Sequence, residues 1–545
     1  MTQDTAADAP AGGTGSSDPA SSPSRTPQGR PRRALRLAAA ALAGLVMYLA
    51  FPPNVLGPDE GGSSGLWPLA MAGVALLALA LRGLGLRLAA LAGLLCGLFF
   101  FVPILPGLRP IGTDAWLGLS LTEAVYFAPM AAGMALVSRT RLWPFWTAAL
   151  WVAQEFVRGR FPLGGFPWAR LAFSQTDTPL TGYAALGGAP LTSFATALAG
   201  ALLAYALLAA LRHRLRAAAL GLAGVLAVPL AGVLIPTGSG NASRGEKEAV
   251  VAVIQGNVPR SGMDFLGQRQ AVLNNHVART RELAAQVRAG QVPRPDLVVW
   301  PENSSDLDPY RDDEAYEVID GAVKDVGVPV LVGALTLTPD GEQVENRGIV
   351  WDPETGPGDY YTKRHPVPFG EYVPFRDLLT GFISRLERVS RDFARGTMDN
   401  QVQVGPAVIG DVICFEVAYD GIVRDAANGS GILVVQTNNA TYGRTSLPWQ
   451  QLAMSRLRAV EHDRPVLVAA TSGISAIVAP DGRLLEQSRE FVPDIQVASV
   501  PVRTSATVSD RLGALPEWIL ALAGIIGLGA AVRARRRPEP DTLEG

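Results

Sequence analysis

The sequence predicts two joined parts, a multi-span α-helical membrane domain and an α/β domain, and three observations lead to this fold class. Apolar residues make up 48% of the 545 positions and gather before residue 237 and again near 514–532. The stretch between these regions has the mixed composition of a soluble domain. Within it, short apolar runs alternate with helix-like segments, which is the pattern of a sheet covered by helices.

The chain is expected to begin with a disordered basic tail over residues 1–32. Ser, Thr, Pro, Gly and Ala dominate the first 29 positions, and such a composition buries too little apolar surface to offset the entropy of ordering. Arginines follow at positions 30, 32, 33 and 36, where the first apolar run begins. The tail is therefore predicted to end at the membrane.

Seven membrane helices are predicted within residues 33–236, and an eighth within 504–533. A spanning helix needs roughly 20 mostly apolar residues. The candidate spans lie near 34–51, 67–81, 85–105, 116–137, 142–157, 191–211, 215–236 and 514–532. The alternative for the first span is a cleaved signal peptide, but its leading segment is unusually long and further spans follow at once.

The distribution of arginine predicts the orientation of these spans. Five arginine clusters fall on one side: the tail, the loops after the second, fourth and sixth spans, and the C-terminal segment 534–545. Positive charge marks the cytoplasmic side, so both termini are expected in the cytoplasm and residues 248–503 outside it. The loop at 158–190, which holds three arginines, is the exception.

Residues 248–503, which follow a linker at 237–247, are predicted to form the α/β domain. Six short apolar runs indicate buried strands at 249–254, 297–300, 328–332, 408–413, 432–435 and 466–470. Helix-like stretches lie between them at 266–289, 310–326 and 449–462. Because the strands are apolar throughout, we expect both faces of the sheet to be covered.

Several functional classes are disfavoured by composition and motifs. The net charge of −2 and the lack of a basic domain argue against a nucleic-acid partner. The two cysteines lie in different predicted domains, and the four histidines are scattered, so neither a disulfide framework nor a metal site is expected. No glycine-rich nucleotide-binding motif is present.

Three short segments carry residues suited to nucleophilic acyl transfer. They are Trp300-Pro-Glu-Asn303, Tyr361–Pro374 and Asp411–Glu416. A cysteine attacks a carbonyl as its thiolate, a lysine stabilises both thiolate and oxyanion, and a carboxylate relays the protons. Glu302, Lys363 and Cys414 could fill these roles. Each alone is more often structural, since a lone cysteine beside apolar residues usually acts as a small buried hydrophobe.

The ordered set Trp-Pro-Glu, Lys and Cys-Phe-Glu resembles the nitrilase, or carbon–nitrogen hydrolase, superfamily. Longer phrases are similar to apolipoprotein N-acyltransferases; they are Glu155–Arg158, Gly165–Trp168, Gln255–Pro259, Trp300–Asn303, His365–Pro374 and Pro448–Gln451. The resemblance implies a four-layer α-β-β-α sandwich on a bacterial cell membrane. It also implies transfer of an acyl chain from a phospholipid, through a cysteine thioester, to the amino group of a diacylglyceryl-apolipoprotein.

The same resemblance implies residue roles and no cofactor. Glu302 would be the general base, Lys363 the stabiliser of oxyanion and thiolate, and Cys414 the nucleophile. Glu371 and Glu416 match supporting acidic positions, and the amide of Phe415 would add an oxyanion donor.

The sequence also departs from the family pattern. Phe415 stands where tyrosine is common, and Asn438–Gly443 differs from the usual Asn-Asp-Ala-Trp-Phe-Gly. An aromatic residue expected soon after Gln255–Pro259 is shifted to the neighbourhood of Asp264 and Phe265. These differences bear on the choice of acyl donor and on loop mechanics. Apolar residues in 375–395 are expected to form a lid resting on the membrane, or else a helix packed on the domain.

Two other functions remain open at this level. One is a membrane-anchored hydrolase of small amides or nitriles, with water as the acceptor. The other is a non-catalytic scaffold that recruits another envelope enzyme.

Overall fold

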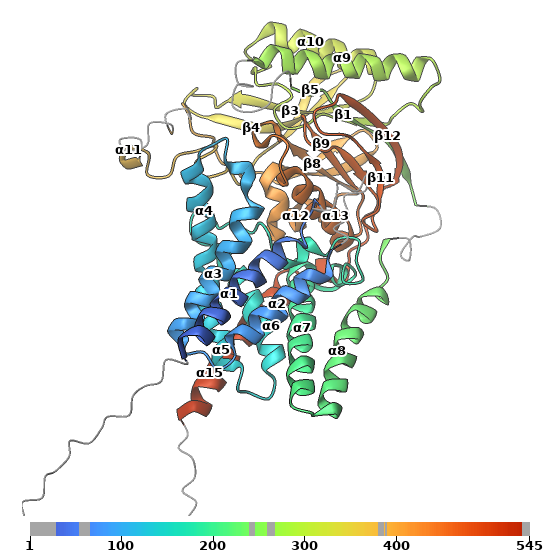
Figure 1. The fold of residues 1–545 in the computed structure, drawn as a ribbon. Coiled ribbons are helices and arrows are strands. Elements are labelled where there is room, and N and C mark those ends of the chain that lie inside the picture. The colour runs from blue at the N-terminus through green and yellow to red at the C-terminus, as the bar shows by residue number, and fades with distance from the viewer. Residues whose placement is uncertain are drawn as a thin grey trace, which may run out of the picture.

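A computed structural model describes residues 29–53, 66–238, 246–258, 268–379, 386 and 390–536. Helices gather at one end of the molecule and two sheets with covering helices at the other (Figure 1). The shifted aromatic near Asp264 and Phe265, the tail before residue 29 and most of the linker fall outside the described residues.

Helices occupy all eight ranges predicted as membrane spans. Their bounds are α1 Gly29–Tyr48, α2 Pro68–Leu81, α3 Leu86–Ile104, α4 Thr113–Val125, α5 Phe127–Val137, α6 Trp143–Arg158, α7 Tyr183–Leu211, α8 Leu215–Val233 and α15 Leu515–Arg536. Five described stretches are long and apolar enough to cross a membrane: α3, α4 with α5, α7, α8 and α15. The multi-span helical domain is thereby confirmed, while a total of eight spans stays a prediction.

The first residues of helices α1 and α7 differ from the expected boundaries. Residues 29–32, assigned above to the tail, form the first turn of α1, where Pro31 is tolerated because first-turn amides have no partner within the helix. Helix α7 begins at Tyr183 rather than near 191, and it breaks at Gly187 and Gly188. Gly188 has a φ of +67°, and a Cβ there would lie 2.4 Å from Glu461 Oε1, so only glycine fits this close approach.

The α/β domain contains two six-stranded sheets. Their strand orders are β12-β1-β2-β3-β4-β5 and β11-β10-β9-β8-β7-β6. The strands of the first are β1 Glu248–Gln255, β2 Leu297–Val299, β3 Val330–Leu337, β4 Val344–Asp352, β5 Gly356–Thr362 and β12 Asp494–Pro501. Those of the second are β6 Gln401–Val404, β7 Ala407–Ile413, β8 Ile432–Thr437, β9 Val466–Ala470, β10 Ala476–Val478 and β11 Leu484–Gln487.

Helices cover the outer face of each sheet and complete four layers. Helices α9 (Arg269–Arg288) and α10 (Asp313–Val326) lie on the first sheet, while α12 (Asp420–Ala427) and α13 (Leu447–His462) lie on the second (Figure 1). The six strands predicted from sequence correspond to β1, β2, β3, β7, β8 and β9. The expected α-β-β-α sandwich is confirmed.

Strand direction brings the predicted site segments to one edge. Strands β1, β2 and β3 are parallel, and the hairpin β4–β5 returns the chain so that β5 runs in the direction of β2. Glu302 and Lys363 therefore both follow the carboxyl ends of strands in the first sheet. Cys414 follows β7, which is parallel to β8 in the second sheet. The two sheets pack through a buried apolar layer that includes Val253, Leu331 and Ile409.

A single apolar core joins the membrane helices to the α/β domain. It includes Phe100 and Trp151 of the helical bundle together with Val417, Leu452 and Val468 of the α/β domain. These side chains fill the space between the bundle and the outer face of the second sheet. Burial of this size argues for a fixed arrangement of the two domains, since hydrophobic association scales with the apolar area removed from water.

Candidate active site

Cys414 lies on a sharp turn between β7 and the short 3₁₀ helix η6 (Cys414–Ala418). Its φ is +57°, a left-handed conformation that costs a non-glycine residue about 1–3 kcal/mol. Gln451 Nε2 donates to the Cys414 carbonyl at 3.0 Å, and Thr437 Oγ1 lies 3.5 Å from Cys414 Sγ. Strain held by surrounding contacts in this way is common at reactive centres.

Glu302 and Lys363 meet in a buried pair opposite this turn. Lys363 Nζ lies 3.0 Å from Glu302 Oε1 and 2.7 Å from Glu371 Oε1. Asn346 Nδ2 donates to Glu302 Oε1 at 2.7 Å, and the Asn438 amide donates to Glu302 Oε2 at 2.7 Å. Glu302 is thus fixed as a carboxylate that accepts bonds on both oxygens, and Lys363 is held by two acids.

The charges of this pair act on the nearby thiol. The pKa of Cys414 is raised to about 12, chiefly by burial and also by the charge of Glu302, while the charge of Lys363 opposes the rise. Burial alone would lower the pKa of Lys363, but the charges of Glu302 and Glu371 hold it well above its usual value. At neutral pH the site therefore contains a neutral thiol beside an ammonium. Forming the nucleophile requires a base to take the thiol proton.

Glu416 connects the cysteine turn to the lysine segment. Its Oε1 accepts from the backbone amides of Arg364 at 2.7 Å and His365 at 2.9 Å, and its Oε2 accepts from the Ile413 amide at 2.9 Å. The Tyr361 hydroxyl lies 3.0 Å from both oxygens. The residues that flank Lys363 and Cys414 are therefore bound to one fully buried carboxylate.

Phe415 packs against aromatic side chains from the membrane domain. Its ring stacks on Phe166 at 5.3 Å and on Trp168 at 5.8 Å between centroids. Trp168 Nε1 donates to Gln450 Oε1 at 2.6 Å, and the Tyr419 hydroxyl donates to the Gly165 carbonyl at 2.8 Å. The loop after α6 thus packs against the turn that holds Cys414.

Buried ion pairs connect the same loop to α12, the helix that follows the Cys414 turn. Arg170 Nη1 lies 2.7 Å from Asp420 Oδ2, and Arg170 Nε lies 3.5 Å from Glu155 Oε2. Asp420 Oδ1 also lies 2.7 Å from Arg458 Nη2. Although burial alone would raise it, the charges of Arg170 and Arg458 hold the pKa of Asp420 well below its usual range.

The structure thus brings Glu302, Lys363 and Glu371 into direct contact and places Cys414 within their electrostatic influence. Glu416 and Phe415 support the turn rather than contact the lysine. Sequence reasoning missed Asn346 and Thr437. Asn346 lies in β4, a strand that the sequence did not reveal, and a lone threonine at a strand end has no local pattern that marks it.

Comparisons with known proteins identify relatives of both parts of the chain. The family model described as "Apolipoprotein N-acyltransferase N-terminal domain" matches residues 43–202, and the model "Carbon-nitrogen hydrolase" matches residues 250–509. An amidase of the nitrilase superfamily from Nesterenkonia AN1 aligns with a TM-score of 0.36 and 20% identity, covering 50% of this chain and 98% of the amidase.

Two relatives are similar over nearly the whole length. An apolipoprotein N-acyltransferase of Mycolicibacterium smegmatis is 37% identical over 531 residues, covering 94% of this chain and 87% of the relative. One of Pseudomonas syringae pv. tomato is 32% identical over 518 residues, covering 89% and 97%. With both family models matched in order and this degree of full-length identity, the chain belongs to the apolipoprotein N-acyltransferase family.

Proposed function

We propose that this protein transfers an acyl chain from a membrane phospholipid to the α-amino group of the N-terminal S-diacylglyceryl-cysteine of apolipoproteins. The observation that carries the proposal is the buried Glu302–Lys363 pair acting on the thiol of Cys414, beside a wall supplied by the membrane domain. Both substrates are lipids, so a nucleophile next to membrane helices can meet them by lateral diffusion.

In the first step, Cys414 attacks the ester carbonyl of the phospholipid while Glu302 takes the thiol proton. The carbonyl oxygen becomes an oxyanion beside the Lys363 ammonium, with the Phe415 amide as a further donor. Collapse of this intermediate breaks the acyl C–O bond, and Glu302 returns the proton to the departing glycerol oxygen. The products are a thioester on Cys414 and a lysophospholipid.

In the second step, the free amine of the apolipoprotein attacks the thioester carbonyl. Glu302 takes a proton from the attacking nitrogen, and the C–S bond breaks to release the N-acylated product. The leaving thiolate is stabilised by Lys363 until it regains a proton from Glu302. The pKa of about 12 for the resting thiol suits this cycle, because the sulfur is neutral until Glu302 accepts its proton.

We infer that both termini face the cytoplasm and that the α/β domain faces outward. Arg36 Nη1 donates to the Arg82 carbonyl at 2.8 Å, and the Arg82 guanidinium lies over Trp143. These contacts gather the arginines of α1 and of the α2–α3 loop at the end of the bundle opposite the sheets (Figure 1). Clustering of arginine at one end supports a cytoplasmic assignment for it.

The test is the lipid structure of a lipoprotein N-terminus, measured by mass spectrometry. A strain with Cys414→Ala as its sole copy should accumulate the diacylglyceryl form with a free amine. Cys96→Ala is the matched control because Cys96 is the other cysteine, buried in α3; it should leave N-acylation intact. Unchanged N-acylation in the Cys414→Ala strain, with no second acyltransferase present, would contradict the proposal.

The covalent intermediate can be trapped directly. Purified protein mixed with labelled phospholipid should retain label that neutral hydroxylamine removes, as expected for a thioester. The label should persist in Cys96→Ala and be lost in Cys414→Ala. Rapid turnover of small amides without lipid would instead favour a hydrolase.

A further inference from the structure

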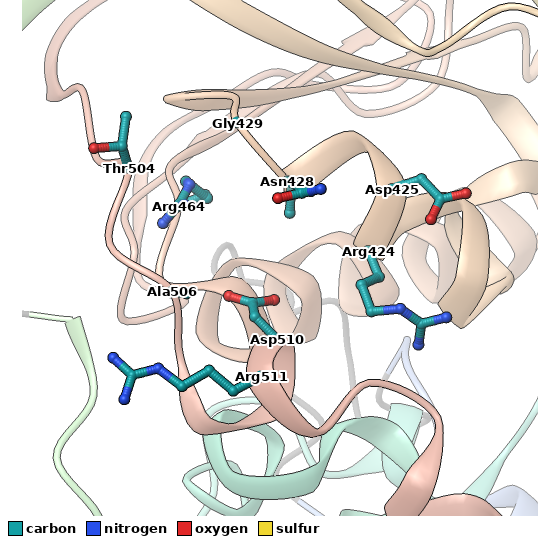
Figure 2. Close-up of a pocket in the computed structure, with 10 residues that line it drawn as sticks. Arg424, Asp425, Asn428, Gly429, Arg464, Thr504, Ala506, Asp510 and Arg511 are labelled. Atoms are coloured by element: carbon teal, nitrogen blue, oxygen red, sulfur yellow. The ribbon is translucent and has the colours of Figure 1, made fainter.

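A cavity lies between residues of α12, of α14 (Val508–Leu512) and of the segment that follows β12. Its volume is about 260 Å³. Figure 2 shows Arg424, Arg464 and Arg511 around it, with Asp510 between them and Asp425 to one side. Three guanidinium groups and two carboxylates therefore line one small space.

The carboxylates of Asp425 and Asp510 form ion pairs or hydrogen bonds with residues other than the three arginines. Asp425 Oδ2 lies 2.7 Å from Arg364 Nη2. Asp510 Oδ1 lies 2.6 Å from His462 Nδ1, and its Oδ2 accepts from the Thr507 amide at 2.9 Å. Neither acid is bonded to an arginine of the cavity.

Two of the three arginines, Arg424 and Arg511, have no ion-pair partner among the residues that the structure describes, whereas the charges of Asp510 and Asp463 act on Arg464. Arg464 is 2% exposed, and its guanidinium donates to backbone carbonyls, including Ser430 at 2.9 Å and Ser505 at 2.7 Å. Its Nη2 and the side chains of Arg424 and Arg511 make no hydrogen bond or ion pair within the described ranges. The cavity thus keeps an excess of positive charge.

The cavity lies at the level where the α/β domain meets the membrane helices. Helix α14 packs on α7 and α13, and only Gly513 and Ala514 separate it from α15. Trp518, in the first turn of α15, is 55% exposed. Exposed tryptophans near helix ends are typical of the membrane–water interface, so the cavity is within reach of lipid head groups.

We infer that this cavity binds the phosphate of an anionic phospholipid in the leaflet next to the α/β domain, at a site separate from Cys414. Arginine guanidinium groups bind phosphate oxygens through paired hydrogen bonds. The volume suits a phosphate and the start of a head group, whereas acyl chains would stay in the bilayer. Binding here needs no acyl transfer, so the inference does not depend on the proposed reaction.

The experiment measures lipid binding to the full-length protein carrying Cys414→Ala, so that no lipid is consumed. Native mass spectrometry in detergent compares the affinities for phosphatidylglycerol and phosphatidylcholine of equal chain length. Loss of one arginine should weaken phosphatidylglycerol binding about fivefold, and Arg424→Gln with Arg511→Gln together about 25-fold, at about 1 kcal/mol for each arginine. Phosphatidylcholine binding should change little.

A matched control removes two arginines far from the membrane. Arg281 and Arg288 lie on α9, at the opposite end of the molecule (Figure 1), and their double change to glutamine should leave phosphatidylglycerol binding unaltered. An equal loss in this control, or unchanged binding in the Arg424→Gln/Arg511→Gln variant, would overturn the inference. Binding of inorganic phosphate at the same arginines with no gain from the lipid would overturn the lipid assignment. The side chains of Arg424 and Arg511 make no hydrogen bond or ion pair with the residues that the structure describes, so their variants should fold.

Discussion

Replacement of Glu416 by glutamine tests whether one buried carboxylate holds the cysteine turn and the lysine segment together. Its two oxygens accept three backbone amides, from Arg364, His365 and Ile413. A glutamine must place its NH₂ group at one of these positions. The amide orientation that loses fewer hydrogen bonds keeps the oxygen facing Arg364 and His365. It turns the NH₂ group toward the Ile413 amide, so that two hydrogen-bond donors face each other.

The free energy that Glu416→Gln removes can be calculated from these hydrogen bonds. Losing the Ile413 bond to a charged acceptor removes about 1.5–3 kcal/mol, and the two remaining amides each lose about 1 kcal/mol when their acceptor becomes neutral. The total is about 4 kcal/mol, which sets an upper bound of about 1,000-fold on a rate change. Because Ile413 directly precedes Cys414, we expect formation of the thioester to slow by about 100-fold or more.

The assay is single-turnover acylation by a labelled phospholipid, measured together with thermal unfolding. Glu486→Gln on β11 is the matched control, since Glu486 is exposed and distant from the site. Glu416→Gln should show slow acylation with lipid binding preserved, and Glu486→Gln should behave as wild type. The reasoning is refuted if Glu416→Gln acylates at more than half the wild-type rate.

Three further predictions follow from the same contacts. Arg170→Gln and Asp420→Asn should each lower the unfolding free energy by about 3 kcal/mol, as for a broken buried pair, and the double variant should cost less than the sum; additive melting temperatures would show that the pair is not coupled. Lys363→Met should slow alkylation of Cys414 in a Cys96→Ala background, because Lys363 lowers the pKa of that thiol, and an unchanged rate at pH 8 would argue against this influence. Burial, with the charges of Arg395 and Lys363, lowers the pKa of His365 to about 4, so the unfolded chain takes up this proton first on acidification. The stability that the neutral imidazole contributes is then full above about pH 6.5 and lost toward pH 4, and His365→Gln should flatten the decline of melting temperature over this range; parallel pH profiles would contradict it.

The buried strands were predictable because their residues are apolar throughout, which marks a strand covered on both faces. The β4–β5 hairpin, which positions Lys363, could not be predicted in this way. Strand β5 has the sequence Gly-Pro-Gly-Asp-Tyr-Tyr-Thr, and glycine and proline are depleted in strands. It pairs because β4 offers a ladder from Arg347 to Asp352, a tertiary effect that no local window contains.

Only those residues of the candidate site that lie within recognisable sequence motifs could be predicted. Glu302, Lys363 and Cys414 could be named, yet their supports come from elements far away in the chain. Asn346 reaches Glu302 across 44 positions, and Asn438 reaches it across 136. Lone polar residues of this kind have no periodicity, so they emerge only when two sheets are packed face to face. The expected lid is described in part, and there Phe375 and Leu378 are 74% and 62% exposed.

The contacts of Arg170 indicate what the membrane domain contributes beyond anchorage. Arg170 is 3% exposed, and a buried cation is tolerated only where anions and hydrogen bonds offset its desolvation. Those anions come from both domains, since Glu155 lies on α6 and Asp420 opens the helix that follows the Cys414 turn. Separating the domains would take away Asp420, the anion that lies nearest to this charge at 2.7 Å, so the interface favours one arrangement. Cys414 is then held at a fixed position relative to the bundle.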